Sequence, residues 1–288
     1  MTTCSTAPLS GAFWRDALRD LIRARELLRD LVWKDLRARY RYTAIGFVWA
    51  VLEPLLMTLI LTFVFSIVFQ YRPGAEALSP DTPFAVFLLC GLIFWNFFRG
   101  SVSDGTKSLV ANRELVGKVS FPLEVIPYAS IGMGLVNFCI GFVIFLGIHV
   151  AFGGGLGGVT VLIAPLFLIQ LSIVAGLTLI LSCINVFFRD IQLITDVLLT
   201  FGFYASPIFY DVNLVRAIAE DSPQLEWIVQ VYMLNPMACL ITAYRDVLLN
   251  QQWPQWQHVA WPAFLGAALF VAGLAVFRRH SGRMADHL

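Results

Sequence analysis

The chain has 288 residues, of which 58% are hydrophobic and only 14% are charged, and its formal net charge is +1. A soluble domain carries about 25% charged residues, so this composition excludes an ordinary soluble globular protein. The near-zero net charge favours no class of charged partner, and we expect no nucleic-acid binding.

Several apolar stretches are long enough to cross a membrane. A transmembrane helix needs about 20 mainly apolar residues to span about 30 Å of hydrocarbon. Six stretches reach that length, at 44–70, 83–103, 121–151, 159–188, 191–210 and 258–277. The sequence therefore predicts an all-α polytopic membrane protein with six transmembrane helices. Its predicted parts are an N-terminal segment at 1–43, a transmembrane domain at 44–279 and a tail at 280–288.

Basic residues are distributed unevenly around these spans. Most lysines and arginines precede the first span, follow the last span, or belong to the connections between the second and third spans and between the fourth and fifth spans. The exceptions are Arg72, Arg216 and Arg245. To those two connections we assign Arg99, Lys107, Arg113, Lys118 and Arg189. Because cytoplasmic loops are enriched in Lys and Arg, we expect the N-terminal segment and the C-terminal tail to be cytoplasmic.

Residues 15–41 have the 3.6-residue period of an amphipathic helix. A charged seam recurs every three or four positions, opposite an apolar face. The seam consists of Arg15, Arg19, Arg23, Glu26, Asp30, Lys34, Arg37 and Arg41, and the apolar face consists of Leu18, Leu21, Leu28, Val32 and Leu36. Such a helix lies in the headgroup plane, either as a membrane-surface anchor or as a docking surface for a cytoplasmic partner.

The connection between the second and third spans, at 104–120, contains a second short helix. Asn112 can cap a helix at 113–118. The proline at position 122 disfavours helix in the residue before it, so we expect the short helix to end before that point.

Residues 207–250 are apolar in part but do not fit a seventh span. A seventh span would place Arg278, Arg279 and Arg283 outside, against the charge distribution. Asn235 and Pro236 favour a helix start. The residues that follow are apolar at helical spacing: Met237, Leu240, Ile241, Tyr244, Val247 and Leu248. We therefore predict short re-entrant helices in the outer leaflet, a conformation that protein or a water-filled cavity must cover.

No pattern of catalytic or metal-binding residues occurs in the sequence. A G-x-x-x-x-G-K-[ST] phosphate loop is absent, so we do not expect the chain itself to hydrolyse ATP. The five cysteines form no C-x-x-C pair and the four histidines are dispersed. A membrane-embedded enzyme would need a catalytic cluster, and an ion-coupled transporter would need paired repeats with ionisable relays. Neither is found, so no catalytic residue, metal or cofactor is predicted.

Aromatic residues are abundant near the predicted ends of the spans. In 191–210, Phe201, Tyr204 and Ile208 share one helix face. Rings at such positions mark the membrane interfaces, or they line a channel in which flat aromatic faces stack against sugar rings. Composition leaves both interpretations open.

Four motifs occur in the order and rough spacing of a known family. They are DLVWKDLRARYRYTAIGFVWAVLEPLL at 30–56, FPLEVIPY at 121–128, FFRDIQLITDVLLTFGFYASPIFY at 187–210 and LNPMACLITAYRDVLL at 234–249. Over residues 27–277 the chain resembles the membrane subunits of bacterial ABC exporters for cell-surface polysaccharides. This group includes permeases for O-antigen, capsule and teichoic acid.

The resemblance implies partners and a location. It implies a homodimer of six-span subunits in the bacterial inner membrane, with two copies of a separate cytoplasmic ATPase that binds ATP and Mg. The substrate would be an undecaprenyl-linked glycan, and membrane lipid would surround the dimer. The implied function is ATP-driven export of a lipid-linked polysaccharide, with O-antigen as the leading cargo, through a channel at the dimer interface. The alternative is an ABC permease for another cargo, such as capsule, teichoic acid, a drug or a lipid.

The resemblance also implies two sets of site residues. The amphipathic stretch would be an interface helix beside the ATPase, and the short helix after Asn112 would be a coupling helix. The coupling set is Arg113, Glu114, Leu115, Val116 and Lys118, with Arg37 and Arg41 of the interface helix. Residues 207–250 would form paired outer gate helices. The channel set is Trp49, Glu53, Phe201, Tyr204 and Tyr210.

Glu53 and Pro54 form an unusual pair inside the first span. At about 1.5 Å per residue, Glu53 lies about 14 Å into that span. An ionised carboxylate facing lipid there would cost several kcal/mol. We therefore expect Glu53 to face the dimer axis, a neighbouring helix or an aqueous channel. Pro54 removes a backbone hydrogen bond and is expected to kink the helix.

Overall fold

The computed structural model describes residues 19–20, 23–41, 46–68, 83–116, 121–221 and 226–287. Every regular element in this part of the chain is helical. The predicted all-α fold is therefore confirmed.

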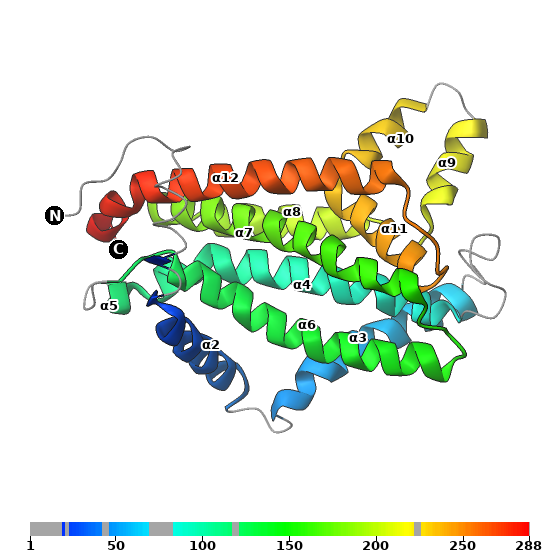
Figure 1. The fold of residues 1–288 in the computed structure, drawn as a ribbon, viewed down its shortest axis with the longest axis horizontal. Coiled ribbons are helices and arrows are strands. Elements are labelled where there is room, and N and C mark those ends of the chain that lie inside the picture. The colour runs from blue at the N-terminus through cyan, green and yellow to red at the C-terminus, as the bar shows by residue number, and fades with distance from the viewer. Residues whose placement is uncertain are drawn as a thin grey trace.

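The helices follow one another with short connections (Figure 1). They are α2 (Arg25–Tyr40), a 3-10 turn (Gly46–Val48), α3 (Trp49–Thr62), a π-helical segment (Phe63–Val68), α4 (Phe84–Ala111), α5 (Arg113–Val116), α6 (Val125–Ala151), a 3-10 segment (Gly158–Leu162), α7 (Ile163–Phe187), α8 (Ile191–Tyr204), α9 (Val212–Asp221), α10 (Glu226–Met233), α11 (Pro236–Leu248) and α12 (Trp256–His287).

Four helices in the described chain are long and apolar enough to cross a membrane. They are Phe84–Ala111, Val125–Ala151, Gly158–Phe187 and Trp256–Met284. Two apolar helices run beside them but are shorter, at Val51–Phe65 and Ile191–Tyr204. These helices are those of a multi-pass membrane protein, whereas the count of six spans stays a prediction.

The second predicted span, 83–103, is shorter than the helix that contains it. α4 continues to Ala111, and Thr106, Ser108 and Leu109 in its last turns are buried. A Cβ at Gly105 would overlap the Thr178 side chain of α7. These residues pack against protein, so the helix continues beyond the apolar stretch that predicts the span.

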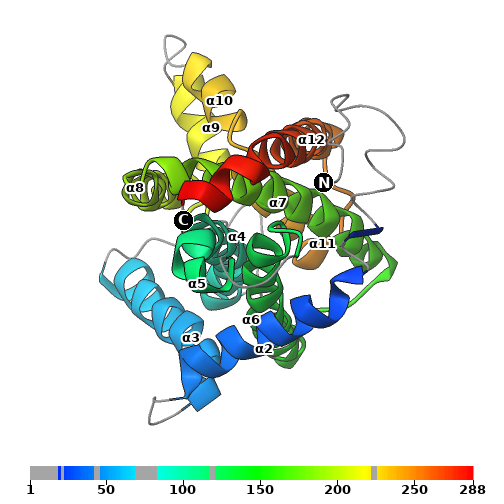
Figure 2. The same ribbon diagram turned by 90° about the vertical axis from the view of Figure 1, so that its left-hand side faces the viewer.

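α4 lies at the centre of the bundle, between α6, α7, α3, α8 and α11 (Figure 2). The Tyr244 ring of α11 stacks on Phe94 of α4, with ring centroids 3.6 Å apart. The Tyr244 hydroxyl donates to Oε1 of Gln170 in α7 at 2.8 Å, and Nε2 of Gln170 donates to the Phe94 carbonyl at 2.8 Å. Because these buried polar groups satisfy one another, the network ties three helices together inside an apolar core.

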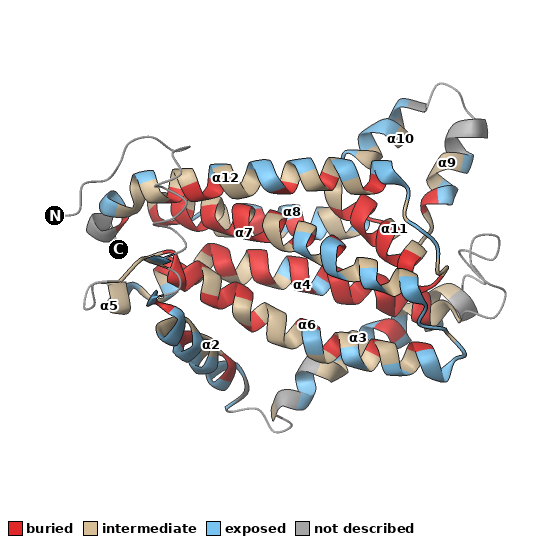
Figure 3. Cartoon of the chain, in the orientation of Figure 1, coloured by how far each residue is buried: buried red, intermediate tan, exposed pale blue. Residues whose placement is uncertain are grey.

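The region predicted as outer gate helices contains three separate helices. Asn235 begins α11 as predicted, since its Oδ1 accepts hydrogen bonds from the backbone N–H groups of Met237 and Ala238 at 3.0 and 3.4 Å. The apolar face predicted for this helix is buried in the bundle (Figure 3). By contrast, α9 and α10 project from the end of the bundle (Figure 1). Whether they act as a gate stays a prediction.

Arg245 of α11 fixes the corner between α8 and α9. Its guanidinium is buried and lies 3.4 Å from the centroid of the Phe87 ring of α4. It donates hydrogen bonds to the carbonyls of Pro207, Ile208 and Phe87. The charge is thus solvated by carbonyl dipoles and an aromatic face, and the corner is held against α4.

The opposite end of the bundle carries α2, α5 and the end of α12 (Figure 1). α2 packs on α6, and Ala24, Leu31 and Leu36 are its buried apolar residues. The predicted amphipathic helix at 15–41 is confirmed for 25–40, while residues 1–18 and 21–22 lie outside the described chain. The guanidinium of Arg278 in α12 donates to the Glu124 carboxylate at 2.6 Å, which joins α12 to the start of α6.

The closest helix pair is α7 and α12, whose backbones meet at glycines. A Cβ at Gly273 would lie 2.6 Å from the Gly176 carbonyl oxygen, and a Cβ at Gly176 would overlap the backbone of Leu269. Small residues at such crossings let helices in membranes approach closely.

Gly176→Ala should therefore lower the thermal stability of the purified protein, because the added methyl group overpacks this crossing at a cost of about 1–3 kcal/mol. The measurement is the midpoint of thermal unfolding in detergent. Gly147→Ala is the matched control, since a Cβ at this α6 position meets nothing within 4 Å. Equal losses in both variants would contradict the close contact.

Candidate functional site

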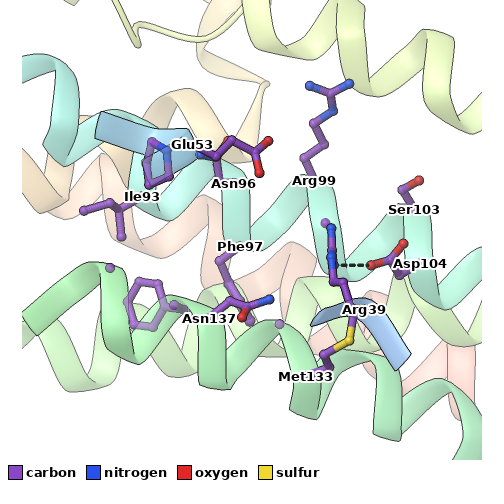
Figure 4. Close-up of a pocket in the computed structure, with 15 residues that line it drawn as sticks. Arg39, Glu53, Ile93, Asn96, Phe97, Arg99, Ser103, Asp104, Met133 and Asn137 are labelled. Carbon is purple, nitrogen blue, oxygen red and sulfur yellow. Dashed lines mark hydrogen bonds and ion pairs between the residues drawn. The ribbon is translucent and has the colours of Figure 1, made fainter. Parts of the chain in front are cut away.

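A cavity of about 320 Å³ opens between α3, α4 and α6 (Figure 4). We call it the α4 pocket. Its lining is unusually polar for a bundle of apolar helices. The polar residues are Arg39, Glu53, Asn96, Arg99, Ser103, Asp104 and Asn137, and the others are Pro54, Ile93, Phe97, Gly100, Met133, Gly134, Phe138 and Gly141.

One face of α4 supplies the polar centre of this pocket. Asn96, Arg99 and Ser103 are spaced by three and four positions, so they share a helix face. We call these three residues the polar strip. Asn96 and Arg99 are exposed, and Figure 4 shows the guanidinium of Arg99 extending away from α6. The strip interrupts a helix whose other faces are buried.

The charges in the pocket divide into two kinds. Asp104 pairs with Nη1 of Arg39 at 3.2 Å and with Nζ of Lys107 at 2.7 Å. Arg99 and Glu53, in contrast, make no hydrogen bond or ion pair with any residue that the structure describes. Within the described ranges, the guanidinium of Arg99 and the carboxylate of Glu53 are therefore the unpaired charges of the pocket.

Two apolar helices flank the polar strip. α3 and α8 lie on the same side of the molecule, with α4 between them (Figure 2). Both expose large apolar side chains: Trp49, Leu56, Met57, Leu59, Ile60 and Phe63 on α3 or directly after it, and Leu193, Ile194, Val197, Leu198, Phe201 and Tyr204 on α8. Ser103 Oγ donates to Oδ1 of Asp196 at 2.6 Å, which links α8 to the strip.

The predicted channel residues lie at separate positions on or near α3 and α8. Trp49, Phe201 and Tyr204 are exposed, and Glu53 lines the α4 pocket. Tyr210 is partly buried and turned elsewhere, since its hydroxyl donates to the Tyr204 carbonyl at 3.1 Å and accepts a hydrogen bond from the Tyr232 hydroxyl at 3.2 Å. A channel role for these residues stays a prediction.

α3 continues through Pro54 without a break in the helix. Proline cannot donate the backbone hydrogen bond expected at its position, and the Thr58 hydroxyl donates to the Pro54 carbonyl at 2.8 Å. The Glu-Pro pair therefore sits on a helix wall of the pocket, with the carboxylate exposed.

The predicted coupling residues form α5 at the end of the bundle. Arg113 and Glu114 are exposed, whereas Leu115 and Val116 pack against the adjacent apolar cluster. Lys118 lies outside the described residues. On the interface helix, Arg37 and Arg41 are also exposed. Contact of these groups with an ATPase stays a prediction.

Asn112 precedes α5, but its side chain does not cap that helix. Oδ1 of Asn112 accepts a hydrogen bond from Nζ of Lys34 in α2 at 2.6 Å, and Nδ2 donates to the Ser108 carbonyl at 2.9 Å. The backbone carbonyl of Asn112 instead accepts from Leu115 and Val116. The expected side-chain cap is thus wrong, because a more distant lysine takes the acceptor.

Lys34 also affects its neighbour on α2. Burial raises the pKa of the Asp35 carboxyl, and the adjacent Lys34 ammonium opposes that rise. In the part of the chain that the structure describes, Lys34 and Arg39 of α2 contact Asn112 and Asp104, respectively.

Arg99, Arg39 and Lys34 are not among the site residues predicted from sequence, although Arg99 and Arg39 line the α4 pocket and Lys34 contacts Asn112. The structure places Arg99 within α4, twelve positions before Ala111. The spacing of Asn96, Arg99 and Ser103 within an apolar run was a signal that could have identified it. No local signal could pair Lys34 with Asn112, since 78 positions separate them.

Comparison with known proteins now bears on this arrangement. Residues 26–249 match the family described as ABC-2 type transporter, which covers most of the chain. The chain belongs to the ABC-2 transporter family. The predicted likeness to ABC permeases is therefore confirmed, and the helices described above are those of an ABC-2 membrane protein.

Several curated relatives of this ABC-2 protein are similar over almost their whole length. The O-antigen export system permease protein RfbA of Myxococcus xanthus is 32% identical, over 94% of this chain and 98% of the relative. The protein of the same name from Klebsiella pneumoniae is 28% identical, over 91% and 95%. The polysialic acid transport protein KpsM of Escherichia coli is 22% identical, over 87% and 92%.

Lys34→Met should loosen the single-turn helix α5, because it removes the contact that holds Asn112. Backbone amide exchange at Arg113–Val116 should become several-fold faster, measured by hydrogen–deuterium exchange with mass spectrometry. Arg29→Met is the matched control, since the Arg29 side chain on the same helix is 71% exposed. Unchanged exchange in Lys34→Met would show that packing alone holds α5.

Proposed function

We infer that this ABC-2 protein is the membrane subunit of an ATP-driven exporter that moves a lipid-linked polysaccharide across the bacterial inner membrane. O-antigen is the first candidate cargo. In this proposal two copies of the chain enclose the channel, and six helices of each copy span the membrane, α3 and α8 included. Both termini are cytoplasmic, and a separate ATPase in two copies binds ATP and Mg.

One observation carries the channel part of the proposal. The polar strip of α4 is exposed between two helices that expose apolar side chains. A charge that faces lipid costs several kcal/mol, so the side that carries Arg99 and Glu53 requires water or protein. A second copy that packed its α3 and α8 against this side would cover the apolar helices and enclose the strips of both copies.

The choice of cargo rests on the relatives. Two are named for O-antigen export and one for polysialic acid transport, and all match this chain over nearly their full length. The exposed rings of Trp49, Phe201 and Tyr204 suit such a cargo, because flat aromatic faces stack on sugar rings. Capsule or teichoic acid would use the same stacking on aromatic rings. A drug or a simple lipid would not need the polar strip.

The cytoplasmic partner would dock at the end of the bundle that carries α2 and α5. Exposed charges gather there, at Arg37 and Arg41 of α2 and at Arg113 and Glu114 of α5. The contacts of Lys34 and Arg39 with Asn112 and Asp104 would let the two helices move as one unit.

A cysteine placed on the polar strip should react with a water-soluble thiol reagent, and its modification should block export. The variant is Asn96→Cys in a chain whose five native cysteines are replaced by alanine. Val143→Cys is the matched control, because Val143 is 67% exposed on α6 and would face lipid. The measurements are the labelling rate in membranes and the amount of polysaccharide at the cell surface. Equal labelling of both cysteines would contradict a water-lined strip.

Replacing Arg113 and Glu114 together with alanine should uncouple ATP hydrolysis from export. Both side chains are exposed, so the variant should insert and fold normally. Hydrolysis by the complex with its ATPase should continue while export falls at least tenfold. Arg189→Ala with Asp190→Ala, an exposed pair in the turn between α7 and α8, is the control. Full export by the α5 variant would overturn the coupling assignment.

A further inference from the structure

A basic cavity lies at the end of α12 and shares no lining residue with the α4 pocket. Its volume is about 340 Å³, and we call it the α12 cavity. The residues that line it are Val276, Arg279, His280 and Arg283. Because they are spaced by three and four positions, they share one face of the helix. The other face is packed, since Phe277 and Met284 are fully buried.

The three arginines of α12 have different surroundings. Arg278 pairs with the carboxylates of Glu124 at 2.6 Å and Asp20 at 3.5 Å, so its charge is compensated inside the subunit. Arg279 and Arg283 are exposed. Neither forms a hydrogen bond or an ion pair with the part of the chain that the structure describes. Within that part, two guanidinium groups about one helical turn apart present positive charge to the cavity.

His280 lies between these arginines on the same face and has a fixed orientation. Its Nδ1 donates a hydrogen bond to the Val276 carbonyl at 2.9 Å, so the remaining hydrogen-bonding capacity of the ring is at Nε2. The ring also meets Phe187 of α7 edge to face, with centroids 6.4 Å apart. The cavity is therefore bordered by the end of α7 as well as by α12.

The two exposed arginines lie at the depth of the lipid headgroups. α12 is one of the helices long and apolar enough to cross a membrane, and its apolar stretch 258–277 ends at Phe277. At about 1.5 Å per residue, Arg279 and Arg283 lie about 3 and 9 Å beyond that point. The headgroup layer is about 5–7 Å thick on each side of the bilayer. A phospholipid phosphate is thus within reach of both flexible side chains.

Toward the membrane interior, the same side of α12 is apolar and open. Ala268, Ala272 and Val276 follow one another at intervals of four positions, and both alanines are exposed. Small side chains let a neighbouring chain approach a helix closely. A hydrocarbon chain attached to the bound phosphate can therefore lie along this row, whereas a soluble anion makes no use of it.

The arrangement selects an anionic phospholipid rather than a neutral lipid or a protein. A guanidinium presents a planar fork of N–H donors that fits phosphate oxygens through parallel hydrogen bonds. Basic pockets beside membrane helices bind the headgroups of anionic phospholipids, whereas a zwitterionic headgroup carries an ammonium that arginines repel. An acidic protein surface would satisfy the charge but could not occupy the apolar row inside the membrane.

We propose that the α12 cavity binds an anionic phospholipid of the surrounding membrane, such as phosphatidylglycerol, with Arg279 and Arg283 on its phosphate. One acyl chain lies along Ala272 and Ala268, and the His280 ring borders the headgroup. This assignment goes beyond the proposed function, because it requires only a chain inserted in a membrane and is independent of the exported cargo.

Native mass spectrometry of the full-length protein in detergent tests this assignment, because it resolves individual bound lipids. The probes are phosphatidylglycerol and phosphatidylcholine with identical acyl chains. Phosphatidylglycerol should bind about tenfold more tightly, and Arg279→Gln combined with Arg283→Gln should remove this preference, since charged two-point contacts are lost. Both side chains are exposed, so the midpoint of thermal unfolding without lipid should not change.

Two further variants locate the effect. Arg279→Lys combined with Arg283→Lys keeps both charges without the planar fork and should retain an intermediate preference. Arg29→Gln removes an exposed arginine of α2 outside the cavity and should bind phosphatidylglycerol as the unmodified chain does. An equal loss in Arg29→Gln, or unchanged binding by the double glutamine variant, would overturn a site at this position.

Competition separates the possible occupants. Excess glycerol phosphate should displace phosphatidylglycerol poorly, and efficient displacement would show a site for soluble phosphate instead. Equal affinity for phosphatidylcholine would overturn the role of the charges. The double glutamine variant should still assemble with the proposed ATPase in detergent. Loss of that assembly with unchanged lipid binding would assign this face to an acidic protein surface.

Discussion

A charged side chain inside a membrane needs a partner or water, and the arrangement around α4 depends on this constraint. Most of this helix is packed core, held by the stack of Phe94 on Tyr244 and the hydrogen bonds of Gln170. Its remaining face presents Asn96 and Arg99 between α3 and α8. One helix therefore both organises the bundle and carries its exposed polar residues.

The ionised groups separate into those that stabilise the subunit and those that do not. Arg278 pairs with Glu124, and Arg245 is bound by backbone carbonyls and the face of Phe87. These contacts lie within one copy of the chain. Arg99 and Glu53 differ because they contribute nothing to the described packing.

The sequence predicted the parts of this molecule that depend on local pattern. Apolar length identified the long helices, and the Asn235-Pro236 start of α11 was predicted correctly because capping is decided within three residues. α4 continues beyond the apolar stretch 83–103, where Gly105 packs on Thr178, a contact that hydropathy cannot reveal. Arg99 was not predicted as a pocket residue because charge counting treats every arginine as a marker of loops. Its significance depends on α3 and α8, which lie far away in sequence.

α8 differs from the four long helices in how little it contributes to the core. Only Thr195 and Leu199 of this helix are buried, and the Ser103–Asp196 hydrogen bond is its polar side-chain link to α4. The free energy of apolar burial scales with the area removed from water, so separating α8 from α4 sacrifices little of it. Displacing this wall of the polar strip therefore costs little buried apolar area. In the proposed exporter, a passage bordered by α8 would widen for a bulky chain while the Phe94–Gln170–Tyr244 core stayed closed.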